Sequence, residues 1–118
     1  MDMRILVPVE ENRGWDSPVS DEFGHAPYFA VVEGGQVRIF SNGEVIRGRG
    51  HRWEEILSLG PDVVITREIG RPAYHVFRNR GVRIYLAEGA TLREVLEKFQ
   101  RGLLKEFPAE LAHEPRHH

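Results

Sequence analysis

The hydrophobic positions of the chain fall into short continuous runs and helix-spaced sets. Three largely apolar runs, the first interrupted by Arg4, are typical of buried strands. They are residues 3–9, 62–66 and 82–86. Residues 28–33 and 36–40 are rich in β-forming side chains, and Gly34-Gly35 between them suits the positive φ angles of a tight turn. The pattern therefore predicts five strands, two of them joined in a hairpin.

Apolar residues recur at helical spacing in three further segments. These are Trp53, Ile56 and Leu57, then Ala73, Val76 and Phe77, then Leu92, Val95, Leu96 and Phe99. Pro72 suits an early position of the second helix, and Gly81 suits its end. Thr91 and Glu94 form a capping-box pattern before the third helix, which Gly102 closes. We therefore expect about three helices.

The order of these elements predicts one α/β domain. The hairpin makes its two strands antiparallel, and right-handed crossovers through helices make the later strands parallel. If the first strand also pairs with the fourth, the sheet is mixed and five-stranded, with the order 3-2-1-4-5. The domain is expected to span residues 1–104. Residues 105–118 are polar and contain Pro108 and Pro115, so we expect a loosely ordered C-terminal tail.

Four loops of this predicted sheet meet at one edge, at the carboxyl ends of the first, fourth and fifth strands. Open α/β sheets place their ligands at such an edge. His25 and His51 reach it from different loops, which suits the ligation of a metal or a metal cluster. Surface histidines with local hydrogen bonds are the alternative interpretation. The polar residues collected there are Asn12, Ser17, Ser20, Asp21, Glu22, His25, His51, Thr66, Arg67, Glu68, Arg71 and Glu88.

Arginines are concentrated in the middle of the chain. Residues 47–83 contain eight arginines and four acidic residues, whereas residues 1–46 contain three basic and eight acidic residues. Arg67 and Arg71 lie just before or at the start of a predicted helix, whose amides could hold an anion together with the guanidinium groups. A solvated, charged helix face is the alternative. Neither a P-loop nor a Gly-x-Gly-x-x-Gly motif occurs, so nucleotide binding is poorly supported.

Composition excludes several classes of function. The chain has no cysteine, which excludes disulfides, thiolate metal sites and cysteine nucleophiles. The net charge of -2 gives no support for nucleic-acid binding. No apolar run approaches the roughly 18 residues of a membrane helix, and no signal-peptide pattern is visible, so we expect a cytoplasmic protein. His117-His118 could be native or a purification remnant and enter no site argument.

Catalytic motifs are also missing from the sequence. There is neither a Gly-x-Ser-x-Gly elbow nor a His-Glu-x-x-His motif. A nuclease of the ribonuclease H type needs acids on its first strand to hold magnesium, and Ile5-Leu6-Val7-Pro8-Val9 has none. We therefore expect a protein that is not an enzyme.

Several stretches carry a family resemblance, the longest being the Ser-Pro-Val-Ser…Phe-Gly-x-Ala-Pro-Tyr-Phe run that starts at Ser17. The stretches are 5–10, 16–29, 50–51, 60–66, 69–70, 81–85 and 88–91. Through them the chain resembles, over about residues 3–102, the dinitrogenase iron–molybdenum cofactor biosynthesis family, which includes NifX-like and NifB C-terminal-like domains. The resemblance implies a ribonuclease H-like three-layer fold. It also implies a non-catalytic role in binding or carrying an iron–sulfur or iron–molybdenum cluster or a precursor.

The resemblance also bears on individual positions. Family members typically have arginine or histidine where His25 stands, and often Gly-Gly where this chain has Arg67-Glu68. Many carry a cysteine, so a cluster here would depend on histidine, carboxylate or its own non-protein ligands. The candidate metal ligands are His25 and His51. The full set of candidate cofactor-binding residues is Ser20, Gly24, His25, His51, Arg67, Gly70 and Arg71.

The expected partners are a metal cluster or small anion and a protein of cofactor assembly, with the chain a monomer or homodimer. Two other functions stay open at this point. One is a protein-interaction domain that kept the fold and lost the cofactor. The other is a metal-dependent phosphoester hydrolase.

Overall fold

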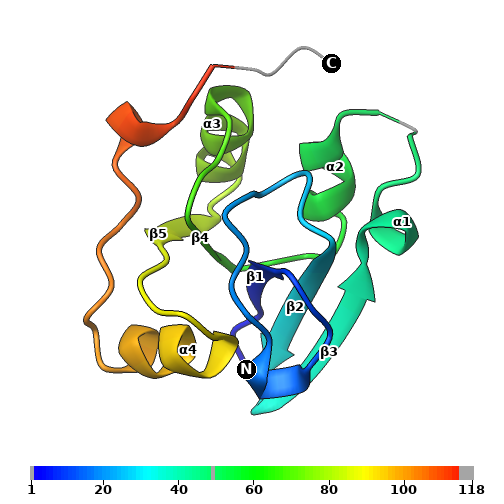
Figure 1. The fold of residues 1–118 in the computed structure, drawn as a ribbon. Coiled ribbons are helices and arrows are strands. Elements are labelled where there is room, and N and C mark those ends of the chain that lie inside the picture. The colour runs from blue at the N-terminus through cyan, green and yellow to red at the C-terminus, as the bar shows by residue number, and fades with distance from the viewer. Residues whose placement is uncertain (1, 49, 115–118) are drawn as a thin grey trace.

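Five strands form one mixed sheet in the computed structural model, which describes residues 2–48 and 50–114 (Figure 1). The strands are β1 (Ile5–Val9), β2 (Tyr28–Glu33), β3 (Gln36–Ser41), β4 (Val63–Thr66) and β5 (Arg83–Leu86). Their order is β3-β2-β1-β4-β5. Strands β1, β2 and β3 are successively antiparallel, whereas β1, β4 and β5 are parallel. The predicted strand order and mixed sheet are confirmed, while the ribonuclease H-like label stays a prediction.

Four α-helices occur in the described residues. They are α1 (Asn42–Val45), α2 (Arg52–Leu57), α3 (Arg71–Asn79) and α4 (Leu92–Gln100). The last three are the predicted helices, whereas no helix was predicted at α1. Its single turn is stabilised by a reciprocal cap, because Ser41 Oγ accepts from the Glu44 amide at 3.3 Å and the Glu44 carboxylate accepts from the Ser41 amide at 2.9 Å.

The cap of α4 forms only in part as predicted. Thr91 Oγ1 accepts a hydrogen bond from the Glu94 amide at 3.3 Å. The Glu94 carboxylate, however, accepts from the amide of Ala90 at 2.9 Å rather than from that of Thr91. The hydrogen bond to the Glu94 carboxylate therefore fixes Ala90, which precedes the N-cap residue Thr91 in the loop after β5.

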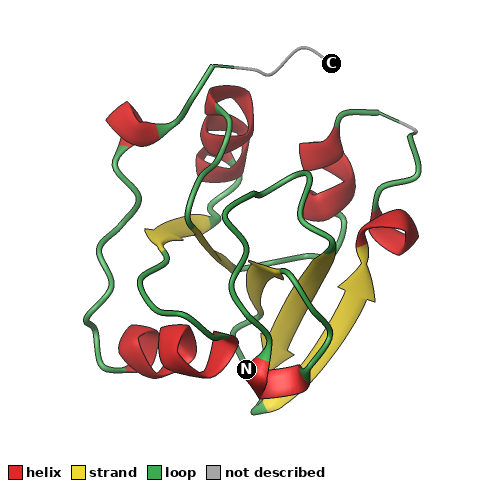
Figure 2. Cartoon of the chain, viewed as in Figure 1, coloured by secondary structure: helices red, strands yellow, loops and turns green. Residues whose placement is uncertain are grey.

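The domain has three layers, with α2 and α3 on one face of the sheet and α4 on the other (Figure 2). Side chains along each strand point alternately to the two faces of the sheet, so the domain has two hydrophobic cores. On β1, Leu6 faces α2 and α3, whereas Val7 and Val9 face α4. Strands β1 and β4 are buried along their whole length because helices cover both faces. No helix among the described residues is long and apolar enough to cross a membrane.

Residues 103–114, which we call the C-terminal strap, pack against the domain. The strap runs from the end of α4 past the edge of the sheet to α3 (Figure 1). It extends the sheet at β5, where the Leu86 amide donates to the Lys105 carbonyl oxygen and the Phe107 amide donates to the Ile84 carbonyl oxygen. Its buried residues are Leu104, Phe107 and Ala112. The expectation of loose order is therefore wrong for residues 105–114, because the apolar residues that dock this polar segment are widely spaced. The rest of the predicted tail, residues 115–118, lies outside the described residues.

Candidate ligand-binding site

The long loop between β1 and β2 folds back onto the carboxyl edge of the sheet. The Ser20 amide donates to the Pro8 carbonyl oxygen at 2.9 Å, and the Val19 amide donates to that of Ala90 at 2.9 Å. The buried hydroxyl of Ser20 donates to the Glu10 carboxylate at 2.5 Å and accepts from the Glu22 amide at 3.0 Å. Ser20 therefore acts within the loop, and this folding brings the following residues, 23–25, to the sheet edge.

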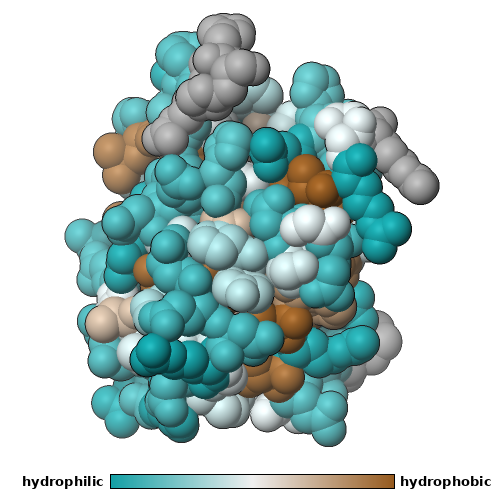
Figure 3. All heavy atoms as spheres, turned by 45° about the vertical axis from the view of Figure 1, so that its right-hand side comes forward, coloured by the Kyte–Doolittle hydropathy of each residue, from teal (hydrophilic) through white to brown (hydrophobic). Residues whose placement is uncertain are grey.

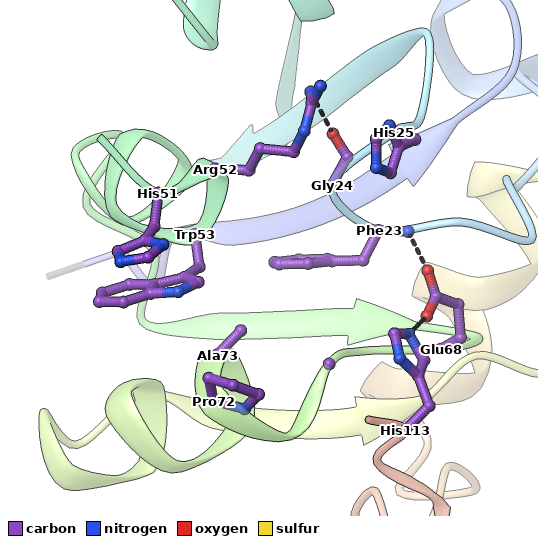
Figure 4. A pocket seen from close by; sticks show the side chains of 11 residues that line it. Phe23, Gly24, His25, His51, Arg52, Trp53, Glu68, Pro72, Ala73 and His113 are labelled. Carbon is purple, nitrogen blue, oxygen red and sulfur yellow. Dashed lines mark hydrogen bonds and ion pairs between the residues drawn. The ribbon is translucent and has the colours of Figure 1, made fainter. Parts of the chain in front are cut away.

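A cavity of about 470 Å³ opens at this edge (Figure 4). Four segments line it: the loop after β1, the start of α2, the β4–α3 loop with the start of α3, and the strap. The lining residues are Phe23, Gly24, His25, His51, Arg52, Trp53, Glu68, Gly70, Pro72, Ala73 and His113. A cavity of this size suits a small ligand.

Four of the sequence-predicted site residues line this cavity. They are Gly24, His25, His51 and Gly70. The exposed ring of His51 stacks on Trp53, with ring centroids 5.1 Å apart and an interplanar angle of 7°. His25 belongs to the loop after β1, so the two histidines reach the same cavity from segments far apart in the sequence.

The structure does not bring the two predicted arginines into the cavity. Arg67 donates to the carbonyl oxygens of Val19 and Gly89 at 3.2 and 2.7 Å, and its Nη1 lies 2.8 Å from an oxygen of Asp21. Arg71 forms an ion pair with Glu114. Neither guanidinium lines the cavity, because each is used to hold a neighbouring segment in place.

Arg52 supplies a guanidinium to the cavity instead. Its Nη1 donates to the Gly24 carbonyl oxygen at 3.3 Å and so connects α2 with the loop after β1. Phe23 and Trp53 add aromatic surface to the same lining. Sequence reasoning treated Trp53 as a core-facing helix position, and it singled out the neighbouring His51 but not Arg52 itself.

Glu68 and His113 are further lining residues that sequence reasoning missed as a pair. One oxygen of the Glu68 carboxylate accepts from the Phe23 amide at 2.8 Å, and the other pairs with His113 Nε2. Glu68 did stand among the polar residues expected at this edge. His113 lay in the segment expected to be a tail, so no sequence signal placed it near residue 68.

The lining combines polarisable apolar surface with groups that carry or can accept positive charge. Phe23, Trp53, Pro72 and Ala73 contribute the apolar part, Arg52 contributes a guanidinium, and three histidines contribute imidazole rings. Glu68 is the one carboxylate among the lining residues of the described chain. This composition favours an anionic ligand with a polarisable body over a bare cation.

A single metal ion is not a good fit to these side chains. Within residues 2–48 and 50–114, no three His, Cys, Asp or Glu residues are grouped closely enough to hold one. Histidines placed separately around a cavity can instead contact different points of a larger ligand, such as a metal cluster that carries its own non-protein ligands. The donor set therefore fits a cluster or an oxyanion better than a chelated ion.

The face shown in Figure 3 is largely hydrophilic, and its hydrophobic areas are small and separated. An extensive protein interface usually has an apolar centre. This face therefore does not have the appearance of one.

A small α/β domain with a cavity at the carboxyl edge of its sheet is the architecture of a ligand-binding domain. Its family follows from comparison with known proteins. The family model described as dinitrogenase iron-molybdenum cofactor matches residues 3–102, and the chain belongs to this family. The family takes its name from a cofactor and not from a reaction.

Individual relatives are similar to this chain over most of their length. The Methanocaldococcus jannaschii protein MJ0580 is 28% identical over 116 residues, covering 89% of this chain and 92% of the relative. The crystal structure of PH0822 is 31% identical, with a TM-score of 0.71 and coverage of 89% and 96%. A candidate NifB protein from Thermotoga is 29% identical, with a TM-score of 0.71 and coverage of 88% and 92%.

The orange protein of Desulfovibrio gigas, in its apo form, is similar in fold. Its TM-score is 0.77 at 24% identity, and the match covers 91% of this chain and 94% of that protein. At this identity the similarity concerns the arrangement of strands and helices alone.

Proposed function

We propose that this chain is a non-catalytic carrier that binds an iron–sulfur or iron–molybdenum type cluster, or a related small anion, in the cavity at the carboxyl edge of its sheet. The observation that carries the proposal is that His25 and His51, from separate segments, line one cavity. The family assignment supports a cofactor-associated role.

Under this proposal the lining side chains have different roles in binding. His25 and His51 offer imidazole nitrogens, which suit iron and other transition metals. The guanidinium of Arg52 offsets the negative charge that a sulfide-bridged cluster carries. Because the chain has no cysteine, the cluster keeps its own sulfide or other non-protein ligands and is held at its periphery.

Peripheral binding suits a carrier that must also release its cargo. A cluster held through few protein bonds exchanges more readily than one fixed by several thiolates. Under this proposal the protein acts in the cytoplasm and exchanges the cluster with a protein partner of cofactor assembly. Arg67 and Arg71 stabilise loops and take no direct part.

Anaerobic reconstitution tests the proposal. Protein without a histidine tag is incubated with ferrous iron and sulfide, with and without molybdate, and desalted. Visible absorption and the ratio of iron to protein are then measured. We expect cluster bands in the unaltered protein and their loss in the double variant H25A/H51A.

His75 offers a matched control, because it is an exposed histidine of α3 that does not line the cavity. H75A is expected to take up the same amount of iron as the unaltered protein. Equal uptake by H25A/H51A and H75A would remove both histidines from the site, and no uptake in any form would reject the carrier function.

A further inference from the structure

The carboxylate of Glu68 contacts two of the segments that line the cavity, the loop after β1 and the strap. Glu68 follows β4, and its Oε1 accepts a hydrogen bond of 2.8 Å from the amide of Phe23, in the segment that carries His25. Its Oε2 pairs with Nε2 of His113, in the strap. Figure 4 shows both contacts at the same side of the cavity. The side chains of Glu68 and His113 are 22% and 32% exposed, so water screens their pairing only in part.

The strap is also held at this point by its backbone. The His113 amide donates to the Ile69 carbonyl oxygen at 3.1 Å, and the Arg71 amide donates to that of His113 at 2.7 Å. These bonds bracket Gly70, where an added Cβ would lie in ordinary contact with the imidazole ring, 3.6 Å from His113 Cε1. The ring is therefore fixed against the cavity from the β4–α3 side.

Both nitrogens of the His113 ring have partners. Nδ1 lies 2.7 Å from the Glu114 carbonyl oxygen, and Nε2 is taken by Glu68. An imidazole engaged at both nitrogens has one orientation and anchors the strap to Glu68, but it has no nitrogen left to ligate a metal. The strap thus presents an oriented ring as part of the lining.

The family match ends at residue 102, so the whole strap lies beyond it. The third histidine of the cavity is consequently contributed by a segment outside the family domain. Glu68 lies inside that domain and is the residue that connects the two.

We propose that Glu68 is a positioning residue that clamps the loop carrying His25 to the strap through His113, and thereby sets the shape of the binding cavity. The proposal rests on the proposed function only in taking the cavity as the binding site. The clamp itself is a property of the ligand-free protein.

Amide hydrogen exchange of the ligand-free protein tests the clamp. In E68A we expect protection at the amides of Phe23 and His113 to fall at least tenfold, since a hydrogen bond to a charged group is lost at each wall. In H113A only the strap should loosen, with protection lost at the Arg71 amide and kept at that of Phe23. Protection at the Phe107 amide, bonded to Ile84, should stay unchanged and shows that the fold is intact.

Two further variants sharpen this result. E68Q retains one acceptor oxygen and gains a donor, so it should restore protection at Phe23. E97A removes an exposed carboxylate of α4, away from the cavity, and should alter neither wall. If protection at Phe23 and His113 in E68A equals that in E97A, the clamp is rejected.

Iron retention tests separately whether the clamp positions the binding residues. After reconstitution with iron and sulfide, E68A should lose iron to a chelator at least tenfold faster than H75A, and E68Q should retain it better than E68A. Equal rates in E68A and H75A would show that the clamp does not position the binding residues. If the unaltered protein takes up no cluster, the proposed function fails, whereas the amide pattern still decides the clamp.

Discussion

Arg67 donates a hydrogen bond of 2.7 Å from Nη2 to the carbonyl oxygen of Gly89, which joins the loop after β4 to the loop after β5. Its Nη1 contacts Val19 and Asp21 on the loop after β1. One guanidinium thus holds three loops at the carboxyl edge of the sheet. An arginine whose sequence context suggested an anion partner serves to fix the loops around the cavity.

Arg67→Ala should destabilise the protein by about 1–3 kcal/mol, because two carbonyl oxygens lose a charged donor and three loops lose their common tie. Urea unfolding measures the change. Arg93→Ala is the control, since Arg93 makes one exposed contact, 3.4 Å from Asp16, and should cost less than about 1 kcal/mol. Similar losses in the two variants would show that Arg67 is not a structural tie.

Phe107→Ala should be among the most damaging substitutions in the chain. The side chain is 2% exposed and packs near Tyr74, with ring centroids 6.2 Å apart. Removing a buried aromatic ring costs about 3–5 kcal/mol. Leu103→Ala, at a strap position that is 60% exposed, should change the free energy of unfolding by about 0.5 kcal/mol or less. A small effect at Phe107 would mean that the strap is not docked in solution.

The hairpin turn between β2 and β3 gives a clean test of backbone conformation. Gly35 has a φ of +77° and Gly43 of α1 has no positive φ, while an added Cβ would meet no atom within 4 Å at either position. Gly35→Ala should therefore cost about 1–2 kcal/mol through strain alone. Gly43→Ala, in a helix, should be neutral or stabilising by up to about 1 kcal/mol. Thermal unfolding of both variants checks the contrast, and equal effects would contradict it.

Glu44 has a lowered pKa because its carboxylate accepts a hydrogen bond from the Ser41 amide, with smaller contributions from the Ser41 side chain and from Arg47. A carboxylate with a depressed pKa stabilises the folded state above its ordinary value of 4.5, and this contribution is lost as the pH falls through the folded pKa. Ser41→Ala should raise the pKa of Glu44 only in part, and Arg47→Ala should raise it less. Carbon-13 NMR titration of the carboxyl group measures each value, and a pKa of 4.5 or above in the unaltered protein would contradict this cause.

Sequence reasoning recovered the sheet because its evidence is local and periodic. Runs such as Val63-Val64-Ile65 are buried on both faces, and Gly34-Gly35 carry the positive φ angles of +59° and +77° that the hairpin needs. The short helix α1 was missed because a single turn has no apolar period, and its cap at Ser41 and Glu44 is the only local signal. The strap was missed because Leu104, Phe107 and Ala112 are too widely spaced to form a pattern.

The positions of the candidate site residues could be predicted only where topology alone decides them. His25 and His51 follow from loops that the strand order brings to one edge. The partners of Arg67, by contrast, lie 48 and 22 positions away in the chain, and those of Glu68 lie 45 positions away on either side. Which loop a long side chain reaches depends on tertiary geometry, and no pattern in the sequence encodes it.

A substitution at Gly70 can separate an effect on ligand binding from an effect on stability. An added Cβ would lie 3.6 Å from His113 Cε1 and 3.9 Å from Pro72 Cδ, which are ordinary contacts, and the φ of -70° suits any residue. Gly70→Ala should therefore leave the free energy of unfolding within about 0.5 kcal/mol of its original value. The methyl group would nevertheless stand between two lining residues, where it narrows the cavity.

If the ligand approaches the Gly70 backbone closely, as glycine allows, the iron that Gly70→Ala retains after reconstitution should fall at least threefold while its thermal unfolding is unchanged. Gly43→Ala, remote from the cavity, should retain the full amount, and equal retention in both variants would place the ligand away from the β4–α3 loop.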